Sequence, residues 1–451
     1  MAAPDRPPDP GETHVQFAQQ HRNRRLRGAA AAAAVTLALL AGAPAQAATV
    51  PPAESSAAAD GIDRAALAKA LDAVHEAGVY GAYATVRDGR ARWNGATGVA
   101  DRDTGRPTTP GMRHRVGSIT KSFTAVAVLQ QSARGRIGLD RPVADYVPGL
   151  LPGERGHKVT VRMLLNHTSG IADYAAEAFP SLKEGSTRSL DEFRYRSITP
   201  GRLIALGTSQ PQLFEPGSDW SYSNTNYVLL GEVLRQVTGE DPEKVITRDV
   251  IRRAGLRDTY FPGTEARIKG PHARMYENWY GLIDPPRDYA DYNMTWAGTA
   301  GALVSTTDDL TAFYRALFQG RLLPAEQLDQ MRTTVPVKDE TGAVAMRYGL
   351  GVFSVETPCG PAWGHNGAVF GAGTEAMTTA DGTRQYAAGH NLMKYERFDA
   401  EGKPVPHPAD AARGAFAIRA LCPAADAART AAAPRPLPEP LDSLPFRGLH
   451  R

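Results

Sequence analysis

The chain has 451 residues, of which 42% are hydrophobic and 22% are charged, and its formal net charge is +3. This length predicts two lobes, and the ordinary share of apolar residues predicts a globular protein with a substantial core. The small, dispersed net charge indicates neither a nucleic-acid partner nor attachment to an anionic membrane.

The first 60 residues have the pattern of an export signal followed by a linker. Four arginines within 22–27 precede an apolar run over 29–41 and an Ala45-Gln46-Ala47 site. This order is typical of a secretory signal, which we expect to cover 1–47, with cleavage after Ala47 and a linker over 48–60. The apolar run is too short for a comfortable membrane span, and no later stretch is long enough. We therefore expect a secreted protein, exported by the Sec or the twin-arginine route.

The segments after residue 60 predict a mixed α/β domain. Short apolar runs between turn residues predict strands near both ends of the chain, and helical periodicity predicts helices around them. In chain order we expect a helix over 62–76, strands over 80–86 and 91–97, helices over 118–134, 226–238 and 310–318, strands over 348–355, 361–365, 373–379 and 385–392, and a helix over 410–421. The Ala/Pro-rich tail over 423–451 is typical of disorder.

The strongest chemical feature is Ser118-Ile119-Thr120-Lys121, which follows Gly117 and begins a helix that is apolar on all sides. Residues three apart share a helical face, so the Ser118 hydroxyl and the Lys121 amine can meet. Burial lowers the pKa of a lysine and provides a neutral amine as a base toward serine. The helix N-terminus offers N–H groups to a developing oxyanion. Because this spacing also arises by chance, a nucleophile needs further partners.

Two further segments carry groups that an acyl-transfer serine enzyme requires. Tyr222-Ser223-Asn224 follows a turn-forming loop, so its tyrosine either reaches into a cleft or anchors the loop by a hydrogen bond. His365-Asn366-Gly367 ends a strand-like segment, and Gly367 permits close approach of a substrate backbone. A lone histidine at such a place is more often structural than catalytic.

A second tripeptide of the tyrosine pattern, Tyr276-Glu277-Asn278, lies in a charged, aromatic run that we interpret as surface. The two cysteines, Cys359 and Cys422, predict a single disulfide in an oxidising compartment. That bridge closes a loop of about 60 residues, which is worth roughly 4 kcal/mol in loop-closure entropy. No C-x-x-C or paired histidine spacing accompanies the cysteines, so we expect neither a metal site nor a cysteine nucleophile.

Taken in order, the motifs at 118–121, 222–224 and 365–367 resemble those of the serine penicillin-recognising hydrolases. This family groups class C β-lactamases, D-alanyl-D-alanine carboxypeptidases, D-aminopeptidases and related esterases. The stretches 164–171 and 298–301 are also similar to it, and the resemblance covers 62–422.

The resemblance implies an α/β domain over 61–422, in which an antiparallel sheet is built from both chain ends, flanked by helices, with an inserted mostly α lobe over about 150–290. The implied roles are Ser118 as acylated nucleophile, Lys121 as its base, Tyr222 as proton relay, Asn224 as a substrate-positioning residue, His365 where relatives carry Lys or His, the N–H groups of Ser118 and Ala368 as oxyanion hole, and Gly367 as a substrate contact. No metal or organic cofactor is implied.

We therefore expect a monomeric serine hydrolase that acts through an acyl-enzyme on Ser118, similar to a D-alanyl-D-alanine carboxypeptidase or a β-lactamase. Its substrate would be a cell-wall peptide, a β-lactam or an ester. The alternatives are an esterase or D-amino-acid amidase of the same fold, or a penicillin-binding sensor without turnover. The resemblance implies that a carboxypeptidase binds the substrate carboxylate with an arginine on the strand before the third motif and a hydroxyl just after that motif. Here 348–354 contains no arginine and Ala368 has no hydroxyl, so we expect weak activity on D-Ala-D-Ala peptides, with Arg347 or Arg384 as the candidates to reach the site. If His365 takes part, activity should carry an apparent pKa near neutrality.

Overall fold

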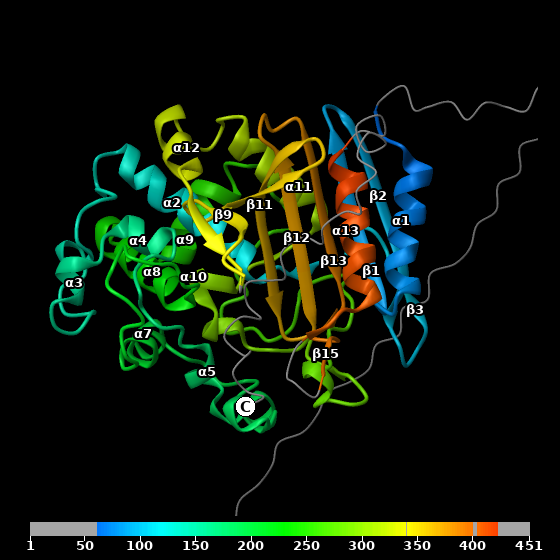
Figure 1. Cartoon of the computed structure of the whole chain (residues 1–451), viewed down its shortest axis with the longest axis horizontal. Helices are drawn as coiled ribbons and strands as arrows, with labels where there is room; N and C mark the ends of the chain where they lie inside the picture. Colours follow the sequence, from blue (N-terminus) through cyan, green and yellow to red (C-terminus); the bar gives the residue numbers. More distant parts are fainter. Residues whose placement is uncertain (1–60, 340, 400–403, 423–451) are drawn as a thin grey trace, which may run out of the picture. The chain divides into compact units, whose positions relative to one another are not determined.

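An antiparallel sheet built from both chain ends organises the fold (Figure 1). The computed structural model describes residues 61–339, 341–399 and 404–422, so the expected secretion signal, linker and tail lie outside the described residues. Within them, the main sheet has nine strands in the order β3-β2-β1-β13-β12-β11-β10-β9-β8. Its strands are β1 (Gly81–Asp88), β2 (Ala91–Asp101), β3 (Arg106–Pro107), β8 (Val335–Lys338), β9 (Val344–Tyr348), β10 (Phe353–Thr357), β11 (Gly360–Val369), β12 (Ala372–Thr379) and β13 (Arg384–His390).

The two ends of the chain meet where β1 pairs with β13, in a register that runs from Ala82 opposite His390 to Asp88 opposite Arg384. The predicted hairpin is confirmed, because β1 and β2 pair antiparallel up to Asp88 and Ala91. Every neighbouring pair of strands in this sheet is antiparallel. The fold class implied by the resemblance is therefore confirmed.

Helices cover both faces of the sheet, and β1 shows how its residues alternate between them. Ala82, Ala84 and Val86 pack in the hydrophobic cluster that also holds residues of helices α1 and α13. Between these positions, Thr85 and Arg87 point the other way and hydrogen-bond to Thr307 and Thr311 of helix α11. Side chains alternate with period two along a strand, so α1 and α13 lie on one face and α11 on the other.

The helices are α1 (Arg64–Glu76), α2 (Thr120–Ala133), α3 (Arg155–Lys158), α4 (Val161–Leu165), α5 (Ala175–Ala178), α6 (Arg188–Glu192), α7 (Pro200–Thr208), α8 (Asn224–Thr238), α9 (Pro242–Ile246), α10 (Gly298–Gly301), α11 (Thr307–Phe318), α12 (Ala325–Arg332) and α13 (Pro408–Leu421). Short strand pairs complete the fold: β4 (His114–Arg115) with β7 (Val304–Ser305), β5 (Tyr276–Glu277) with β6 (Arg287–Asp288) and β14 (Leu392–Met393), and β15 (Arg397–Phe398) with β16 (Pro404–Val405). The segment predicted to form a mostly helical lobe holds α3 to α9.

Helix α2 is buried continuously from Thr120 to Gln131, as its all-round apolar pattern predicts. A 3₁₀ turn over Gly117–Ile119 precedes it, so Ser118 sits at the very start of the helical segment. Helix α2 ends at Ala133, Arg134 is its C-cap, and Gly135 follows with a φ of 70°.

The prediction of one strand over 348–355 is wrong, because the chain reverses inside that range. Strand β9 ends at Tyr348 and β10 begins at Phe353, with the two paired antiparallel. Gly351, with a φ of +76°, lies in the connection, and a Cβ there would come within 2.5 Å of the Ala125 side chain on α2. An unbroken apolar run hides such a turn, since its residues are buried on both sides of the reversal.

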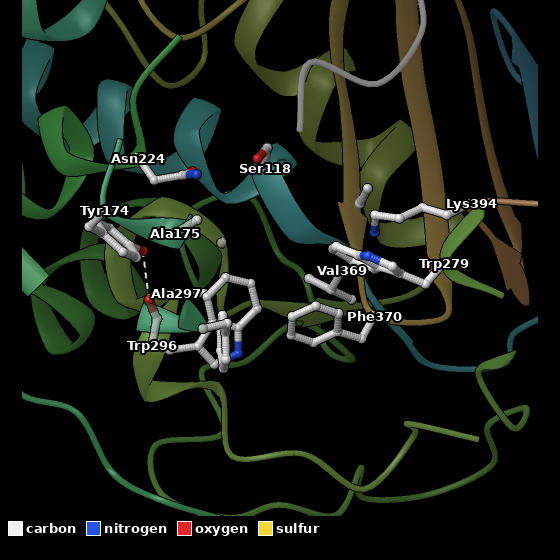
Figure 2. Close-up of a pocket in the computed structure, with 13 residues that line it drawn as sticks. Ser118, Tyr174, Ala175, Asn224, Trp279, Trp296, Ala297, Val369, Phe370 and Lys394 are labelled. Atoms are coloured by element: carbon white, nitrogen blue, oxygen red, sulfur yellow. Dashed lines mark hydrogen bonds between the residues drawn. The ribbon is translucent and has the colours of Figure 1, made fainter. Parts of the chain in front are cut away.

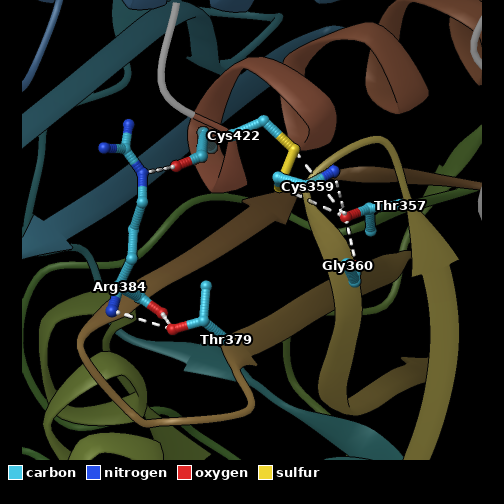
Figure 3. The surroundings of a disulfide bond; sticks show 7 residues. Thr357, Cys359, Gly360, Thr379, Arg384 and Cys422 are labelled. Carbon is cyan, nitrogen blue, oxygen red and sulfur yellow. Dashed lines mark hydrogen bonds between the residues drawn. A yellow bond between two sulfur atoms is a disulfide. The ribbon is translucent and has the colours of Figure 1, made fainter. Parts of the chain in front are cut away.

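The disulfide between Cys359 and Cys422 is present, with Cα atoms 5.6 Å apart (Figure 3). Cys359 lies between β10 and β11, and Cys422 caps the C-terminus of α13. Nearby, Arg384 donates from Nε to the Ala420 carbonyl oxygen at 2.7 Å, which adds a second tie between α13 and the sheet. The bridge therefore fastens the last helix to the sheet that it covers.

Removing this bridge with the double substitution Cys359→Ser and Cys422→Ser should lower the free energy of unfolding by about 4 kcal/mol, because it frees a loop of 63 residues in the unfolded chain. Urea denaturation followed by circular dichroism measures the change. Alkylation and mass spectrometry of the unreduced protein should find one bridged peptide pair. Two alkylated cysteines, or equal unfolding free energies, would contradict the assignment.

Candidate active site

Two glycines bring the turn that carries Ser118 against strand β11. Gly117 has a φ of +52°, and a Cβ there would lie 2.7 Å from the Ala368 nitrogen. A Cβ on Gly367 would lie 2.1 Å from the Val116 carbonyl oxygen. Real Cβ atoms do not approach so closely, so only glycine fits at both positions. The backbones of Ser118 and Ala368 are thereby held side by side at the edge of the site.

Four of the predicted side chains converge at this point. Lys121 Nζ lies 2.8 Å from Ser118 Oγ and 2.7 Å from Asn224 Oδ1. It also donates to the Ala300 carbonyl oxygen at 2.8 Å. Tyr222 donates its hydroxyl hydrogen to Ser118 Oγ at 2.7 Å. The four side chains come from the 3₁₀ turn before α2, the start of α2, the segment before α8 and α8 itself.

The partners of Lys121 suit a proton acceptor. Asn224 Oδ1 and the Ala300 carbonyl oxygen can only accept hydrogen bonds, so each takes an N–H of the lysine. Once it has lost its proton, the Lys121 amine directs its lone pair toward the Ser118 hydroxyl, 2.8 Å away. The arrangement can therefore move the serine proton to Lys121 while Tyr222 donates to the same oxygen.

Asp173 fixes the orientation of Asn224, and sequence reasoning missed it. Its Oδ2 accepts from the Asn224 backbone nitrogen at 2.6 Å and from Asn224 Nδ2 at 2.8 Å. Its Oδ1 accepts from the Ala175 nitrogen at 2.7 Å. Because a carboxylate accepts only, Asn224 must turn its amide nitrogen to Asp173 and its oxygen to Lys121. In the sequence, Asp173 is marked only by lying shortly after the stretch 164–171.

The stretch 164–171 supports Tyr222 from behind. The rings of His167 and Tyr222 have centroids 4.4 Å apart, and His167 Nδ1 accepts from the Ser223 nitrogen at 3.2 Å. Ser169 donates from Oγ to Asn226 Oδ1 at 2.8 Å, which ties the stretch to α8. Burial, with the nearby Lys121 charge, holds the pKa of His167 well below its usual value. A neutral ring therefore packs behind the tyrosine.

The structure directs the hydrogen bonds of His365 toward Tyr348 and Asn366. Its Nδ1 donates to the Asn366 carbonyl oxygen, so its Nε2 accepts from the Tyr348 hydroxyl, 2.9 Å away. The residue is fully buried. Burial and the charge of Lys121 lower the pKa of His365 to about 3. The expectation that His365 gives activity a pKa near neutrality is wrong, because the ring is already neutral well below pH 7.

Neither candidate arginine lies at the site. Arg347 donates from Nε to Thr334 Oγ1 at 3.2 Å on the exposed side of β9. Arg384 is held at the other end of the sheet, where it pairs with Asp88 at 2.7 Å. The hypothesis that one of them binds a substrate carboxylate is therefore wrong.

An aromatic pocket opens beside Ser118 (Figure 2). Its cavity volume is about 50 Å³, and the wider space of about 570 Å³ around it includes open solvent. Its lining residues are Ser118, Tyr174, Ala175, Phe179, Asn224, Trp279, Trp296, Ala297, Gly301, Ala368, Val369, Phe370 and Lys394. Phe370 is central to the wall, since the ring centroids of Phe179 and Trp296 each lie 5.3 Å from its own.

The interpretation of Tyr276-Glu277-Asn278 as surface is wrong. All three residues are buried, and Trp279, which follows them, forms part of the pocket wall. The Glu277 carboxylate accepts from the backbone nitrogens of Trp279 and Gly371 at 3.0 and 2.9 Å. These hydrogen bonds offset the cost of burying a charge, and a sequence pattern does not reveal them.

Within the ranges that the structure covers, no cluster of His, Cys, Asp and Glu has the arrangement of a metal site. In the same ranges, no helix has the length and apolar character needed to cross a membrane.

The fold and the convergence of serine, lysine and tyrosine define a serine hydrolase of the penicillin-recognising group. A model of the family described as Beta-lactamase matches residues 64–393, and the chain belongs to this family.

Comparison with solved structures and curated proteins adds particular relatives. A D-stereospecific amidohydrolase from Streptomyces is 40% identical, with a TM-score of 0.67 over 74% of this chain and 95% of that one. The D-amino acid amidase of Ochrobactrum anthropi SV3, solved with L-phenylalanine amide, is 25% identical, with a TM-score of 0.63 over 73% of this chain and 91% of that one. Esterase EstB of Burkholderia gladioli is 35% identical over 213 residues, which cover 45% of this chain and 54% of the esterase. The chain thus spans about half the length of that curated relative.

The role of Asp173 in orienting Asn224 predicts a loss of activity in Asp173→Asn. The new amide has one acceptor oxygen instead of two, so it cannot accept from both Asn224 and Ala175, and its hold on the Asn224 side chain weakens. We expect kcat/KM on any ester substrate to fall about 100-fold, because a displacement of a catalytic group by about 1 Å can cause a loss of this size. Asp308→Asn, which changes a carboxylate on α11 that pairs with Arg87, is the matched control. Activity within threefold of the parent in Asp173→Asn would contradict this role.

Buried neutral histidines predict a loss of stability in mild acid. Burial lowers the pKa of His114 to about 4, while an unfolded histidine titrates near 6.5. Between these values the unfolded chain binds the extra proton, so the free energy of unfolding falls as the pH drops, by about 1.4 kcal/mol per pH unit for this residue. The stabilisation is complete above pH 6.5.

His114→Gln keeps the hydrogen bonds to Tyr83 and Gly373 but removes the titration. The slope of unfolding free energy against pH, measured with urea between pH 4.5 and 6, should become shallower by about 1.4 kcal/mol per pH unit. His157→Gln, at an exposed position, is the matched control. An unchanged slope in His114→Gln would contradict the prediction.

Proposed function

We propose that this protein hydrolyses amides and esters of D-amino acids with aromatic side chains through an acyl-enzyme on Ser118. The observation that carries the proposal is the position of Ser118 Oγ, which is hydrogen-bonded to Tyr222, lies 2.8 Å from Lys121 Nζ and opens onto an aromatic pocket. The catalytic groups supply acyl transfer, and the pocket supplies the preference for the acyl group.

In the proposed reaction, Ser118 Oγ attacks the carbonyl carbon of the substrate while Lys121 takes the hydroxyl proton. The backbone N–H groups of Ser118 and Ala368 hold the oxyanion that forms. Tyr222 gives its proton to the leaving nitrogen or oxygen as the bond to carbon breaks, and Lys121 restores that proton. Water then attacks the ester on Ser118, and the same groups act in reverse to release the acid.

Asn224 and Gly367 complete the proposed site as contacts for the substrate. The Asn224 amide stands beside Lys121, and Gly367 lies in β11, where a bound acyl chain can run along the strand. His365 is proposed as a positioning residue. Its neutral ring holds Tyr348 and the end of β11 in place, and it does not exchange protons during turnover at neutral pH.

The substrate class rests on the walls of the pocket. Phe179, Trp296 and Phe370 offer flat apolar surfaces to an aromatic side chain, and such contacts dominate recognition of rings. The similarity to a D-stereospecific amidohydrolase and to a D-amino acid amidase supports D-configured substrates. A carboxypeptidase must also bind the free carboxylate of its leaving group, and the two arginines proposed for that task are engaged elsewhere.

Export belongs to the same proposal. The disulfide between Cys359 and Cys422 favours an oxidising compartment, and the expected signal over 1–47 would deliver the chain there.

The proposal is tested by kcat/KM for the amides and methyl esters of D- and L-phenylalanine, beside a D-Ala-D-Ala tripeptide and nitrocefin. We expect the D-phenylalanine ester to be the best substrate, with its L-enantiomer at least about tenfold poorer, because one pocket must hold the ring while the carbonyl meets Ser118. Ser118→Ala should lower kcat/KM at least about 1,000-fold. Ser132→Ala, near the end of α2, is the matched control.

A tenfold preference for the tripeptide would replace the proposal with a carboxypeptidase. A label on Ser118 that persists for hours without product would replace it with a binding sensor.

A further inference from the structure

A lysine ammonium forms part of the pocket beside the nucleophile. Lys394 follows strand β14, lines the same pocket as Ser118 and is only 7% exposed. Figure 2 shows its side chain reaching over Trp279, on the side of the pocket away from Asn224. Its Nζ lies 4.5 Å from the ring centroid of Trp279 and 5.7 Å from that of Phe370. A cation is therefore built into the pocket wall next to the rings of Trp279 and Phe370.

The hydrogen-bonding capacity of Lys394 is not used up by its neighbours. In the described part of the chain, its one oxygen partner is Glu277 Oε2, at 3.5 Å, in a buried ion pair whose distance is long for a hydrogen bond. The same oxygen already accepts from the Gly371 nitrogen at 2.9 Å. An ammonium has three N–H donors, so Lys394 retains donors for a group that enters the pocket.

The backbone around Lys394 is held in an unusual conformation. Lys394, Trp279 and Tyr280 have φ values of 48°, 48° and 58°, in the left-handed region that residues with a Cβ rarely adopt. The Tyr280 nitrogen donates to the Lys394 carbonyl oxygen at 2.6 Å, which joins the two segments. Such conformations persist only where the surroundings impose them, and they gather at ligand sites.

From this geometry we infer that the pocket is specific for an acyl group with an aromatic body and a terminal carboxylate, which Lys394 binds. The inference rests on the proposed function, since this is the acyl group that Ser118 accepts. The rings of the wall pack against the aromatic body. The carboxylate takes the remaining N–H donors of Lys394 in a largely desolvated place, where such charge-assisted bonds are strong. An acyl group that ends in a cation is repelled.

The test compares three D-amino acid amides that differ only at the para position: D-phenylalanine amide and its 4-carboxy and 4-aminomethyl derivatives. In the unsubstituted enzyme, kcat/KM for the 4-carboxy compound should exceed that for D-phenylalanine amide by about tenfold, the size of a charge-assisted hydrogen bond. The 4-aminomethyl compound should be the poorest substrate.

Lys394→Met should lower the ratio of 4-carboxy to unsubstituted kcat/KM by at least about tenfold. It should also raise the ratio of 4-aminomethyl to unsubstituted kcat/KM, and misfolding does not produce such a gain. Lys394→Arg, which keeps the charge, should keep the preference for the 4-carboxy compound. Suppose that both enzymes hydrolyse D-phenylalanine amide, and that the kcat/KM of each derivative relative to this amide is the same in the parent enzyme and in Lys394→Met. The inference is then overturned and the proposed function stands.

A binding measurement separates the inference from turnover. If no amide is hydrolysed, the proposed function fails, and calorimetry with Ser118→Ala protein decides the inference alone. The probes are D-4-carboxyphenylalanine and D-phenylalanine. The inference is supported if Ser118→Ala protein binds the carboxy compound at least about tenfold more tightly, and if this preference is lost when Lys394→Met is added to that protein. Equal binding of the two probes overturns it.

Discussion

The buried contacts of Lys121 are the constraint on which the rest of the active site depends. A lysine with no exposed surface must find its hydrogen-bond partners inside the protein, and its partners here come from α8 and α10 as well as from the turn of Ser118. Helix α8, which carries Asn224, is therefore fixed relative to the turn that carries Ser118. Asp173 extends this constraint by orienting Asn224, and Gly117 and Gly367 extend it by letting β11 touch the nucleophile turn.

Much of the frame was predictable because local patterns and global fold agree. The hairpin at Asp88, the all-round apolar helix after Ser118 and the strands after residue 360 follow from periodicity and turn residues. The three motifs were found because their residue types are unusual together. The missed features depend on contacts between distant segments. Asp173 is one acidic residue among many, and Glu277 reads as exposed until the backbone nitrogens that satisfy it are known.

The structure also changes how specificity and protonation are understood. His365 is buried and neutral, so the pH response near neutrality belongs to other groups. Lys394 lines the pocket beside Ser118, while Arg347 and Arg384 bond to the sheet and the helix that covers it. If the acyl group binds in this pocket, as we propose, Lys394 favours selection of the acyl donor rather than of a leaving residue that ends in a carboxylate.

Activation of Ser118 by Lys121 and Tyr222 can be measured by peptide mapping with mass spectrometry after treatment with a fluorophosphonate at neutral pH. We expect a single adduct on the peptide that contains Ser118, formed at least about 100-fold more slowly in Lys121→Met, since that variant lacks the base. An adduct on another serine, or an equal rate in Lys121→Met, would contradict it.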